Sequence, residues 1–375
     1  MSRSTVISID AMGGDRGPAS VLEGMGQALA ANPQISFIVH GDESELNRLL
    51  QRHPALGARC DVRHAAQIIS MSEKPSRALR DGRDSSMWHA LDAVAKGEAK
   101  VAVSCGNTGA LMAMAIFVLR KAPGIDRPAI AVNWPSTAPH GFNTMLDMGA
   151  DVRADPRNLL QFAVMGAEYA HLRFGIERPR VGLLNVGTEP SKGPQELREA
   201  GLLLEAAAND RFAYVGFVEG TDITKTTADV IVTDGFTGNV ALKAAEGTAS
   251  FISRTLRDSF QHSVWSRIGG LFAMSSLQRL RQRIDPRRVN GGVFLGLNGA
   301  VVKSHGGADA VGFRSAIKLA IKMAESDFPL LVAAELAKVG AGEPRQVSEQ
   351  KRDGAAAPAA APSPDTDDGP ADQEG

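Results

Sequence analysis

The sequence predicts an α/β protein built around a mainly parallel, doubly wound β-sheet. Two observations support this prediction. Short apolar runs alternate with amphipathic helical patterns along the chain, and this alternation is typical of βα units that share one sheet. In addition, five of the apolar runs end at a turn rich in glycine and small polar residues. At 375 residues the chain is long enough for one large α/β domain or two smaller ones.

The expected strands are short apolar runs, and they are Val6–Ile9, Ile35–His40, Arg59–Arg63, Val101–Ser104, Ala129–Asn133, Thr144–Met148, Val181–Asn185, Tyr214–Phe217, Val230–Thr233 and Gly299–Val302. The expected helices carry apolar residues at helical spacing, and they are Pro18–Ala31, Ser44–Arg52, Ser85–Ala95, Thr108–Leu119, Arg157–Leu172, Pro194–Ala207, Asn239–Phe260 and Ala308–Ala324. Only ten residues separate Ala129–Asn133 from Thr144–Met148, so we expect an antiparallel pair there.

Glycine-rich turns after strands predict a site for an anion. A strand that ends in such a turn before a helix presents backbone N–H groups at the positive end of the helix dipole. Five such turns on one chain predict a cleft for an anion, with phosphate favoured, along the carboxyl edge of the sheet. The five segments are Val6 to Pro18, Val101 to Ala110, Val181 to Gly193, Val230 to Asn239 and Ala300 to Asp309.

The composition is that of an ordinary globular protein, with 43% hydrophobic residues, 22% charged residues and a net charge of −1. Cys60 and Cys105 are too few for a disulfide framework, which fits a reducing cytoplasm. No secretory signal opens the chain, and the longest apolar run, Ala110 to Leu119, is about half of the ~20 residues that a membrane helix needs. We expect a cytoplasmic protein that touches a membrane only at its surface, and no nucleic-acid partner.

The first turn places Gly13 and Gly14 between Asp10 and Asp15. Glycines here allow the backbone to approach a ligand closely. The turn lacks the G-x-G-x-x-G pattern of dinucleotide sites, and the chain has no P-loop. A plain strand-to-helix turn is the alternative interpretation.

In the second turn, Asn107 or Thr108 is the expected N-cap of a helix. Cys105 precedes them and is a tempting nucleophile. A catalytic thiol needs a base and an orienting group, and no histidine neighbours Cys105 in the sequence. A small buried cysteine is therefore the favoured interpretation.

The remaining three turns carry the polar and charged side chains that are the main candidates for catalysis or binding. Lys192 precedes a helix on a glycine-flanked turn, where its charge suits a phosphate or a developing oxyanion; a solvated loop lysine is the alternative. Asp234 and Asn239 share the next turn, and an amide is a natural donor to a carbonyl oxygen. His305 stands on the last turn and is either a ligand or a structural histidine. No His, Cys and carboxylate cluster has the spacing of metal ligands, so we expect no catalytic metal.

Between Phe260 and Arg288 the chain interleaves apolar residues with six arginines and one acidic residue. Such a basic amphipathic helix or hairpin suits an anionic membrane surface or an acidic protein; an ordinary helix pair packed on the core or a second subunit is the alternative. We expect Gly269 and Gly270 to break the helix, which favours an exposed hairpin. The expected contact residues are Trp265, Ile268, Leu271, Phe272, Arg279, Arg281 and Arg283.

The C-terminal region changes composition at about residue 340 and becomes rich in alanine, proline and acidic residues. Such a segment buries too little apolar surface to offset the entropy of ordering. We therefore expect a catalytic domain of residues 1–339, with the hairpin of residues 260–288 inserted in it, and a disordered tail of residues 340–375.

Several segments together resemble the bacterial phosphate acyltransferase family of phospholipid synthesis, PlsX. The resemblance covers roughly Val6 to Ala337. It rests on DAMGGD, MSEKPSRALR (Met71–Arg80), SCGNTGALMA, LNVGTEPSKG, FVEGTDI (Phe217–Ile223), TDGFTGNVALKAAEG and KSHGGADA in this order. The combination is highly specific, although each piece alone is not. In LDMGAD, Asp151 stands where we expect the family to have asparagine, so Asp151 is left out of the site.

The resemblance implies a reaction between fatty acyl-[acyl carrier protein] and inorganic phosphate that gives acyl phosphate. It implies a three-layer α/β/α sandwich related to phosphotransacetylases and isopropylmalate-type dehydrogenases, no cofactor, a homodimer and peripheral membrane association beside a membrane glycerol-3-phosphate acyltransferase. By motif, Lys192 and Asn239 are the expected catalytic residues. The expected substrate-binding residues are Asp10, Gly13, Gly14, Asn107, Thr108, Gly187, Asp234, Gly238 and His305.

Three other functions remain open at this point. A phosphotransacetylase acting on a short acyl-CoA would use similar turns but leave the hairpin without a purpose. A nicotinamide-dependent decarboxylating dehydrogenase on the same fold would need a cluster of metal-binding aspartates, and the sequence has no persuasive one. A non-catalytic membrane scaffold for lipid enzymes is the third.

Overall fold

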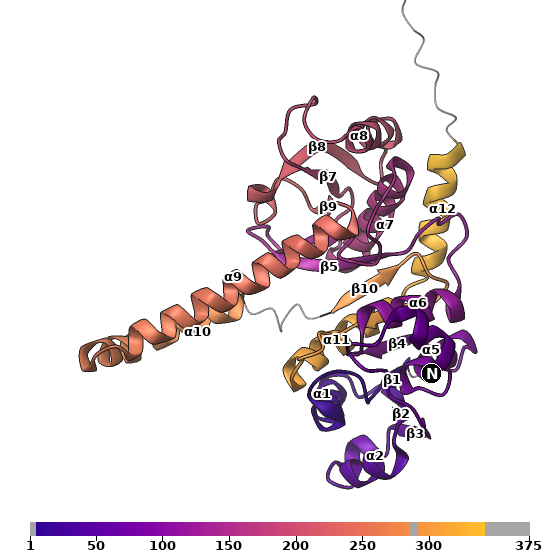
Figure 1. The fold of residues 1–375 in the computed structure, drawn as a ribbon, viewed down its shortest axis with the longest axis vertical. Helices are drawn as coiled ribbons and strands as arrows, with labels where there is room; N and C mark the ends of the chain where they lie inside the picture. The colour runs from indigo at the N-terminus through magenta and orange to yellow at the C-terminus, as the bar shows by residue number, and fades with distance from the viewer. Residues whose placement is uncertain (1–4, 285–290, 342–375) are drawn as a thin grey trace, which may run out of the picture. The chain divides into compact units, whose positions relative to one another are not determined.

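An 11-stranded β-sheet runs through the described part of the chain, residues 5–284 and 291–341 of the computed structural model (Figure 1). The strand order across the sheet is β3-β2-β1-β4-β11-β10-β5-β6-β9-β7-β8. In chain order the strands are β1 (Thr5–Asp10), β2 (Ile35–Gly41), β3 (Cys60–His64), β4 (Val101–Ser104), β5 (Ala129–Pro135), β6 (Phe142–Leu146), β7 (Arg180–Asn185), β8 (Ala213–Glu219), β9 (Val230–Val232), β10 (Gly292–Leu295) and β11 (Ala300–Lys303). Seven of the ten strand pairings are parallel, so the prediction of a mainly parallel sheet is confirmed.

Helices cover both faces of this sheet. They are α1 (Gly17–Ala31), α2 (Glu43–Leu50), α3 (Pro54–Gly57), α4 (Pro75–Asp81), α5 (Ser86–Ala95), α6 (Thr108–Leu119), α7 (Pro156–Phe174), α8 (Gln195–Ala207), α9 (Gly235–Gln261), α10 (Val264–Ile284), α11 (Ala310–Ala324) and α12 (Phe328–Ala341). One core holds apolar residues of α1, α7, α8, α11 and α12, and the other holds those of α4, α5, α6 and the base of α9. Successive strand residues such as Ala102 and Val103 enter opposite cores. The predicted three-layer sandwich is therefore confirmed.

The direction of the strands corrects the prediction of a single carboxyl edge. The strands β3, β2, β1, β4 and β11 run parallel to one another, and β6, β9, β7 and β8 form a second parallel set. Between them three neighbouring pairs are antiparallel, namely β11 with β10, β10 with β5, and β5 with β6. The expected antiparallel pair of β5 and β6 is confirmed. Because three reversals separate the two sets, the five glycine turns fall on two half-sheets that run in opposite senses.

One strand, β10, and three α-helices, α3, α4 and α12, escaped the sequence patterns. β10 has only four residues between Gly291 and Gly296, which both have positive φ, yet it pairs with β11 and β5 inside the sheet. α9 begins at Gly235, four residues before the expected start, because the Asp234 side chain caps it by accepting from the Thr237 N–H at 2.8 Å.

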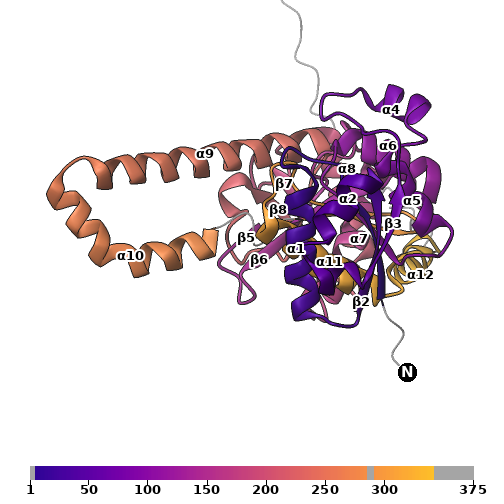
Figure 2. The same ribbon diagram turned by 90° about the horizontal axis from the view of Figure 1, so that it is seen from below.

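The hairpin consists of α9 and α10, which leave the rest of the molecule as two arms (Figure 2). It turns at His262 and Ser263, and α10 continues through Gly269 and Gly270, so the expected helix break is wrong. A Cβ on Gly270 would lie 3.1 Å from Phe260 Cδ1, which indicates that this glycine serves the close approach of α10 to α9. The predicted insertion of the hairpin of residues 260–288 into the catalytic domain stays a prediction.

None of the described helices is both long enough and apolar enough to cross a membrane. The described residues belong to one compact unit, Met1–Ala341. Apart from Gly340 and Ala341 at the end of α12, the predicted tail of residues 340–375 lies outside the described residues. The domain division at residue 339 stays a prediction.

Candidate active site

A first cluster of turns forms where β1, β4 and β11 end. Strand register places Asp10 opposite Ser104, and Ser104 opposite Lys303. The turns after these strands are also joined, because the Asp15 N–H donates to the Gly306 carbonyl at 2.8 Å. Residues from three distant parts of the chain therefore form one surface, which we call the first turn cluster.

Asp10 organises this cluster from the inside. Its side chain is fully buried, and burial raises the pKa of the carboxyl group. The carboxylate accepts from the Ser86 hydroxyl at 2.7 Å, from the Ser104 hydroxyl at 2.6 Å and from the N–H groups of Met12 and Gly13. These donors occupy the carboxylate, so the geometry supports a positioning role for Asp10. Direct contact with substrate stays a prediction.

Gly13 and Gly14 are required by close packing between the turns. A Cβ on Gly13 would lie 2.6 Å from an Asp10 carboxylate oxygen. Gly14 has φ +93°, and a Cβ there would lie 2.8 Å from both the Gly306 carbonyl oxygen and Cys105 Cβ. Both sites therefore exclude a side chain, whether or not the turn binds a ligand.

Lys303 is a residue of this cluster that the sequence reasoning missed. It is 8% exposed, and its Nζ donates to the carbonyl oxygens of Cys105, at 3.3 Å, and Ser304. Burial lowers the pKa of Lys303 to about 8. An ammonium has three N–H donors, so one remains beyond the two carbonyl bonds. A lysine at the end of an apolar strand, directly before a glycine turn, is the sequence signal that could have identified it.

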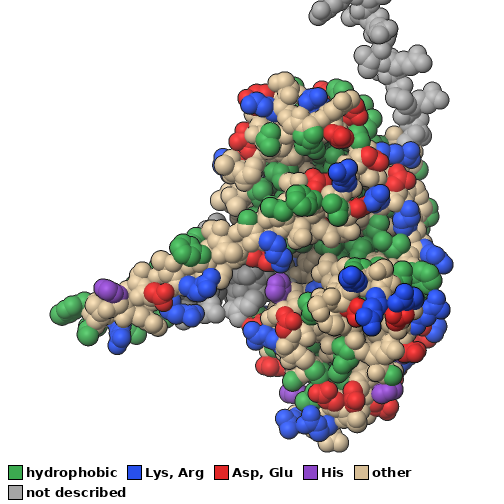
Figure 3. Space-filling view, viewed as in Figure 1, with side chains coloured by type: hydrophobic (Ala, Val, Ile, Leu, Met, Phe, Trp, Pro, Cys, Tyr) green, Lys and Arg blue, Asp and Glu red, His purple; other side chains and the backbone are tan. Residues whose placement is uncertain are grey.

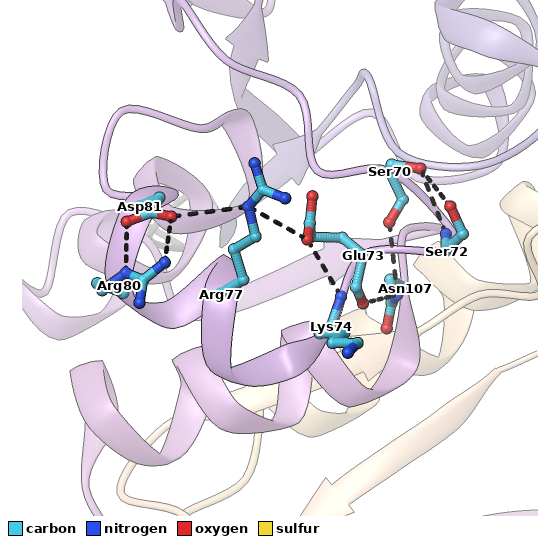
Figure 4. Close-up of polar contacts among 8 residues, drawn as sticks. All are labelled: Ser70, Ser72, Glu73, Lys74, Arg77, Arg80, Asp81 and Asn107. Atoms are coloured by element: carbon cyan, nitrogen blue, oxygen red, sulfur yellow. Dashed lines mark hydrogen bonds and ion pairs between the residues drawn. The ribbon is translucent and has the colours of Figure 1, made fainter.

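Asn107 is the confirmed N-cap of α6, since its Oδ1 accepts from the Ala110 N–H at 3.0 Å. Its Nδ2 donates to the carbonyl oxygens of Met71, at 2.8 Å, and Glu73, at 2.9 Å, as Figure 4 shows for the Glu73 side of this contact. Asn107 therefore anchors the segment before α4. Thr108 is half-buried in the first turn of α6. Binding of substrate by either side chain stays a prediction.

Cys105 lies beside these residues but is a poor nucleophile. It is 3% exposed, and burial raises the pKa of its thiol to about 11. A thiol needs to ionise to attack a carbonyl group. The geometry therefore agrees with the interpretation of Cys105 as a small buried residue.

A second cluster of turns forms where β6, β9 and β7 end in parallel. Asp147 organises it as Asp10 organises the first. The Asp147 side chain is fully buried and accepts from the N–H groups of Ile130, Gly149, Ala150 and Asp151 at 2.9–3.2 Å. Desolvation outweighs these bonds and raises the pKa of Asp147 to about 6. The sequence reasoning did not identify Asp147, although its Asp-Met-Gly segment resembles the one around Asp10.

The base of α9 packs on the turn that Asp147 holds. A Cβ on Gly238 would lie 2.0 Å from the Asp147 carbonyl oxygen, so Gly238 is a packing glycine. Asn239 follows on the exposed side, and its side chain lies against Gly149, where a Cβ would be 3.5 Å from Asn239 Cγ. The Asp234 carboxylate caps α9, because it accepts hydrogen bonds from the N–H and the hydroxyl of Thr237. Asn239 is thus an exposed polar side chain at this helix end.

Lys192 lies in the loop after β7, in the same second cluster. The loop is held by Asn185, whose Nδ2 donates to the Lys192 carbonyl at 3.1 Å. The Lys192 side chain crosses Gly187, where a Cβ would lie 3.1 Å from Lys192 Cγ. Within residues 5–284 and 291–341 its ammonium has no ion-pair partner. Lys192 therefore presents an exposed positive charge at the edge that also holds Asn239.

α9 connects the two clusters. Glu246 on this helix places its Oε1 4.0 Å from Nε2 of His305 in the first cluster. Asn239 and Glu246 are seven residues apart, which is about 10 Å along an α-helix. The base of α9 therefore borders both clusters, and the face in Figure 3 is hollowed beside it. His305 is more than half exposed, and its Nδ1 accepts from the Gly307 N–H at 3.0 Å.

The apolar residues predicted to contact a membrane or carrier protein are exposed on α10. Trp265 is 81% exposed and Phe272 is 86% exposed, and Ile268 and Leu271 are exposed with them. Hydrophobic side chains also extend along α9 (Figure 3). The side chains of Arg279, Arg281 and Arg283 lie outside the described residues. Their contacts stay predictions.

Comparison with known proteins identifies the family. A family model described as "Fatty acid synthesis protein" matches residues 5–331. A phosphate acyltransferase of Paracoccus denitrificans is 59% identical over 334 residues, which are 89% of this chain and 90% of the relative. The chain belongs to the phosphate acyltransferase family of enzymes. Another member, from Cereibacter sphaeroides, is 57% identical over 89% of this chain and 91% of its own length.

Solved structures extend the likeness of fold beyond this family. The EutD phosphotransacetylase from Staphylococcus aureus superimposes with a TM-score of 0.55 at 16% identity, covering 86% of this chain and 94% of its own. A phosphotransacetylase from Streptococcus pyogenes gives a TM-score of 0.58 at 16% identity, covering 86% and 95%. At such low identity these two similarities establish the fold alone.

Proposed function

We propose that the protein transfers a long fatty acyl group from acyl carrier protein to inorganic phosphate. The acyl phosphate formed would supply glycerol-3-phosphate acylation in phospholipid synthesis. Membership of the phosphate acyltransferase family over residues 5–331 is the observation that carries this proposal. Two turn clusters that both border the base of α9 support it, because together they offer lysine and amide side chains for phosphate and thioester.

The proposed reaction needs positioning more than activation. A phosphate oxygen attacks the thioester carbonyl carbon and forms a C–O bond. The tetrahedral intermediate then collapses, the C–S bond breaks, and the carrier-protein thiolate leaves and takes a proton from water. Phosphate is already anionic near neutral pH, so holding it close to the thioester supplies much of the rate. No acyl-enzyme is required, which agrees with the buried thiol of Cys105.

We assign separate roles to the charged and amide side chains. Lys192 and Lys303 supply positive charge for phosphate, one from each turn cluster. Asn239 donates to the thioester oxygen as that oxygen gains negative charge. Asp10 and Asp147 do not touch the reacting atoms in this proposal, and they fix the turns that carry those groups.

The hairpin of α9 and α10 provides the proposed membrane contact. Trp265 and Phe272 are large apolar side chains that water surrounds in the single chain, and such residues favour a membrane interface. This contact would place the enzyme beside the membrane acyltransferase that consumes acyl phosphate. We further propose that the enzyme works as a homodimer, as the resemblance implies.

The proposal is tested by comparing acyl donors. Purified full-length protein is mixed with labelled inorganic phosphate and with palmitoyl-[acyl carrier protein], palmitoyl-CoA or acetyl-CoA, and acyl phosphate is trapped with hydroxylamine. We expect product from the palmitoyl carrier donor only when phosphate is present. Turnover of acetyl-CoA with no product from the carrier donor would contradict the proposal and favour a phosphotransacetylase. No product from any donor would favour the scaffold function.

A further inference from the structure

The segment Met71–Arg80, which the family resemblance includes, has no role in the function described so far. It forms α4 and the turn before it, and its cations point outward. Lys74, Arg77 and Arg80 follow at three-residue spacing and therefore lie on one side of the helix. The side chains of Arg77 and Arg80 are 66% and 75% exposed, and Figure 4 shows them with their acidic neighbours Glu73 and Asp81.

Two further arginines extend this positive surface along α6. Arg83 places its guanidinium carbon 5.7 Å from the Trp88 ring centre and 5.9 Å from that of Phe117. The guanidinium carbon of Arg120 lies 5.3 Å from the Phe117 ring centre. Both guanidiniums stack on aromatic rings and pair with no carboxylate of the described residues. Their charge is therefore available to a partner.

We call Lys74, Arg77, Arg80, Arg83 and Arg120 the α4 basic surface. Among the described residues, the carboxylate partners of these five cations are Glu73 and Asp81, and those pairs are exposed or partly exposed. Exposed ion pairs contribute little energy and exchange readily. Figure 3 shows Lys and Arg side chains gathered over the region where Figure 1 places α6.

The α4 basic surface adjoins the first turn cluster. Asn107, the N-cap of α6, holds the carbonyl groups of Met71 and Glu73. The Met71 side chain reaches Gly306, where a Cβ would lie 2.7 Å from Met71 Cε. At the other side of the segment, a Cβ on Gly109 would lie 2.8 Å from Pro75 Cγ. A partner seated on α4 would therefore stand next to the turns that the proposed reaction uses.

We propose that the α4 basic surface docks the acidic acyl carrier protein and directs its thioester arm to the first turn cluster. The proposal rests on the proposed function, which makes a carrier protein the acyl donor. Carrier proteins of this kind are strongly acidic, so their charge complements five clustered cations. Stacked Arg83 and Arg120 are held in place before the partner arrives, which lowers the entropic cost of binding. The hairpin then serves the membrane, and donor and membrane do not compete for one surface.

Binding of holo-acyl carrier protein tests this proposal directly. A fluorescently labelled holo-carrier protein is titrated with the full chain, with an Arg77→Glu and Arg83→Glu double variant, and with a neutral Arg77→Gln and Arg83→Gln variant. An Arg48→Glu and Arg52→Glu variant is the matched control, because both arginines are exposed, Arg48 on α2 and Arg52 just after it. We expect affinity to fall roughly tenfold or more in the Glu variant, less in the Gln variant, and not in the control. Circular dichroism verifies that each variant is folded.

A second measurement separates docking from chemistry. Turnover of an acyl-pantetheine thioester, which lacks the carrier protein, is expected to be unchanged in the Arg77 and Arg83 variants. If the Glu variant binds the carrier protein as tightly as the unaltered chain does, the docking proposal is wrong. The proposal is also wrong if that variant keeps its affinity for the carrier protein and instead loses binding to anionic vesicles. If the unaltered chain forms no acyl phosphate from any donor, the proposed function fails, while the binding titration still decides the docking surface.

Discussion

Glu246 Oε1 lies 4.0 Å from His305 Nε2, and this contact joins a helix of one half-sheet to a glycine turn of the other. The helix is α9, which begins on the turn held by Asp147 and carries Asn239 about 10 Å before Glu246. The two turn clusters therefore meet at the base of one helix, although their strands run in opposite senses. Substrates with two anionic or polar ends could be held across this junction.

Lys192→Ala is expected to lower kcat with palmitoyl-[acyl carrier protein] by roughly 10²–10³-fold, because it removes a charge placed at the reacting phosphate. The Lys192 side chain is exposed and makes no ion pair with a described residue, so the melting temperature should not change. Steady-state kinetics and a thermal melt measure both effects. Lys318→Ala, at an exposed lysine of α11, is the control. Normal turnover in Lys192→Ala would refute the assigned role.

Lys303 predicts a dependence of phosphate binding on pH. Burial lowers its pKa to about 8, and the neighbouring titratable groups are those of Cys105, Asp10, Lys243 and Asp15. The KM for phosphate should therefore rise as pH increases through about 8, because the ammonium loses its proton. In Lys303→Met the KM should already be high below about pH 8 and should not rise further as pH increases through about 8. A flat KM in the unaltered enzyme between about pH 7 and 9 would contradict a charged role.

The lowered pKa of Lys303 also makes the free energy of unfolding depend on pH. The pKa of Lys303 is about 8 in the folded chain and 10.5 ordinarily. Between these values the unfolded state binds the extra proton, so this residue makes the free energy of unfolding rise with pH. Urea titrations of the unaltered chain and of Lys303→Met across this range should differ in slope. If the free energies of unfolding of the two proteins change with pH in parallel, the pKa of Lys303 is not lowered in the folded chain.

Asp147→Asn is expected to lower the free energy of unfolding by about 1–3 kcal/mol, because an amide nitrogen would face backbone N–H donors that now bond to a carboxylate. The N–H groups of Ala150 and Asp151 both donate to Asp147 Oδ2. Since the turn also supports Asn239, kcat should fall, while the KM for phosphate should change less. Urea unfolding and kinetics measure the two effects. Asp222→Asn, at an exposed pair with Lys225, is the control.

Replacing Trp265 and Phe272 with serine is expected to weaken binding to anionic vesicles, because both side chains are exposed and would enter the membrane interface. Turnover of a soluble donor should not change. Co-sedimentation with vesicles of anionic and of neutral lipid measures the effect. Leu202→Ser, at a 68% exposed leucine of α8, is the control. Unchanged vesicle binding would leave the hairpin as a subunit interface instead.

Much of the fold could be predicted because local patterns determine it. The alternation of apolar runs and helical patterns identified most strands and helices, and the short spacing of β5 and β6 identified their antiparallel pairing. The four-residue strand β10 could not be found, because its position in the sheet depends on pairing with β5, which lies far away in sequence. That strand reverses the sheet, so the sequence also could not reveal that the glycine turns form two clusters.

The sequence singled out exposed side chains of the candidate site, but it did not single out the buried charged residues Asp147 and Lys303. Lys192 stands on a glycine turn and Asn239 near the start of α9, which follows another such turn, and a sequence pattern singles out both positions. The roles of Asp147 and Lys303 depend on burial and on bonds to distant backbone groups, which no local pattern reveals. The helix break expected at Gly269 and Gly270 was wrong because it also depended on a distant contact. The packing of Gly270 against Phe260 outweighs the low helix propensity of glycine.

Direct attack of phosphate on the thioester is the central claim, and an exchange experiment tests it most directly. Palmitoyl-[acyl carrier protein] is incubated with the enzyme and with labelled free carrier protein, first without phosphate and then with it, and acyl phosphate is detected with hydroxylamine in separate samples that are not used to measure exchange. We predict no transfer of palmitate to the labelled carrier without phosphate, and both acyl phosphate and carrier exchange once phosphate is added. Exchange in the absence of phosphate would reveal an acyl-enzyme and contradict this account.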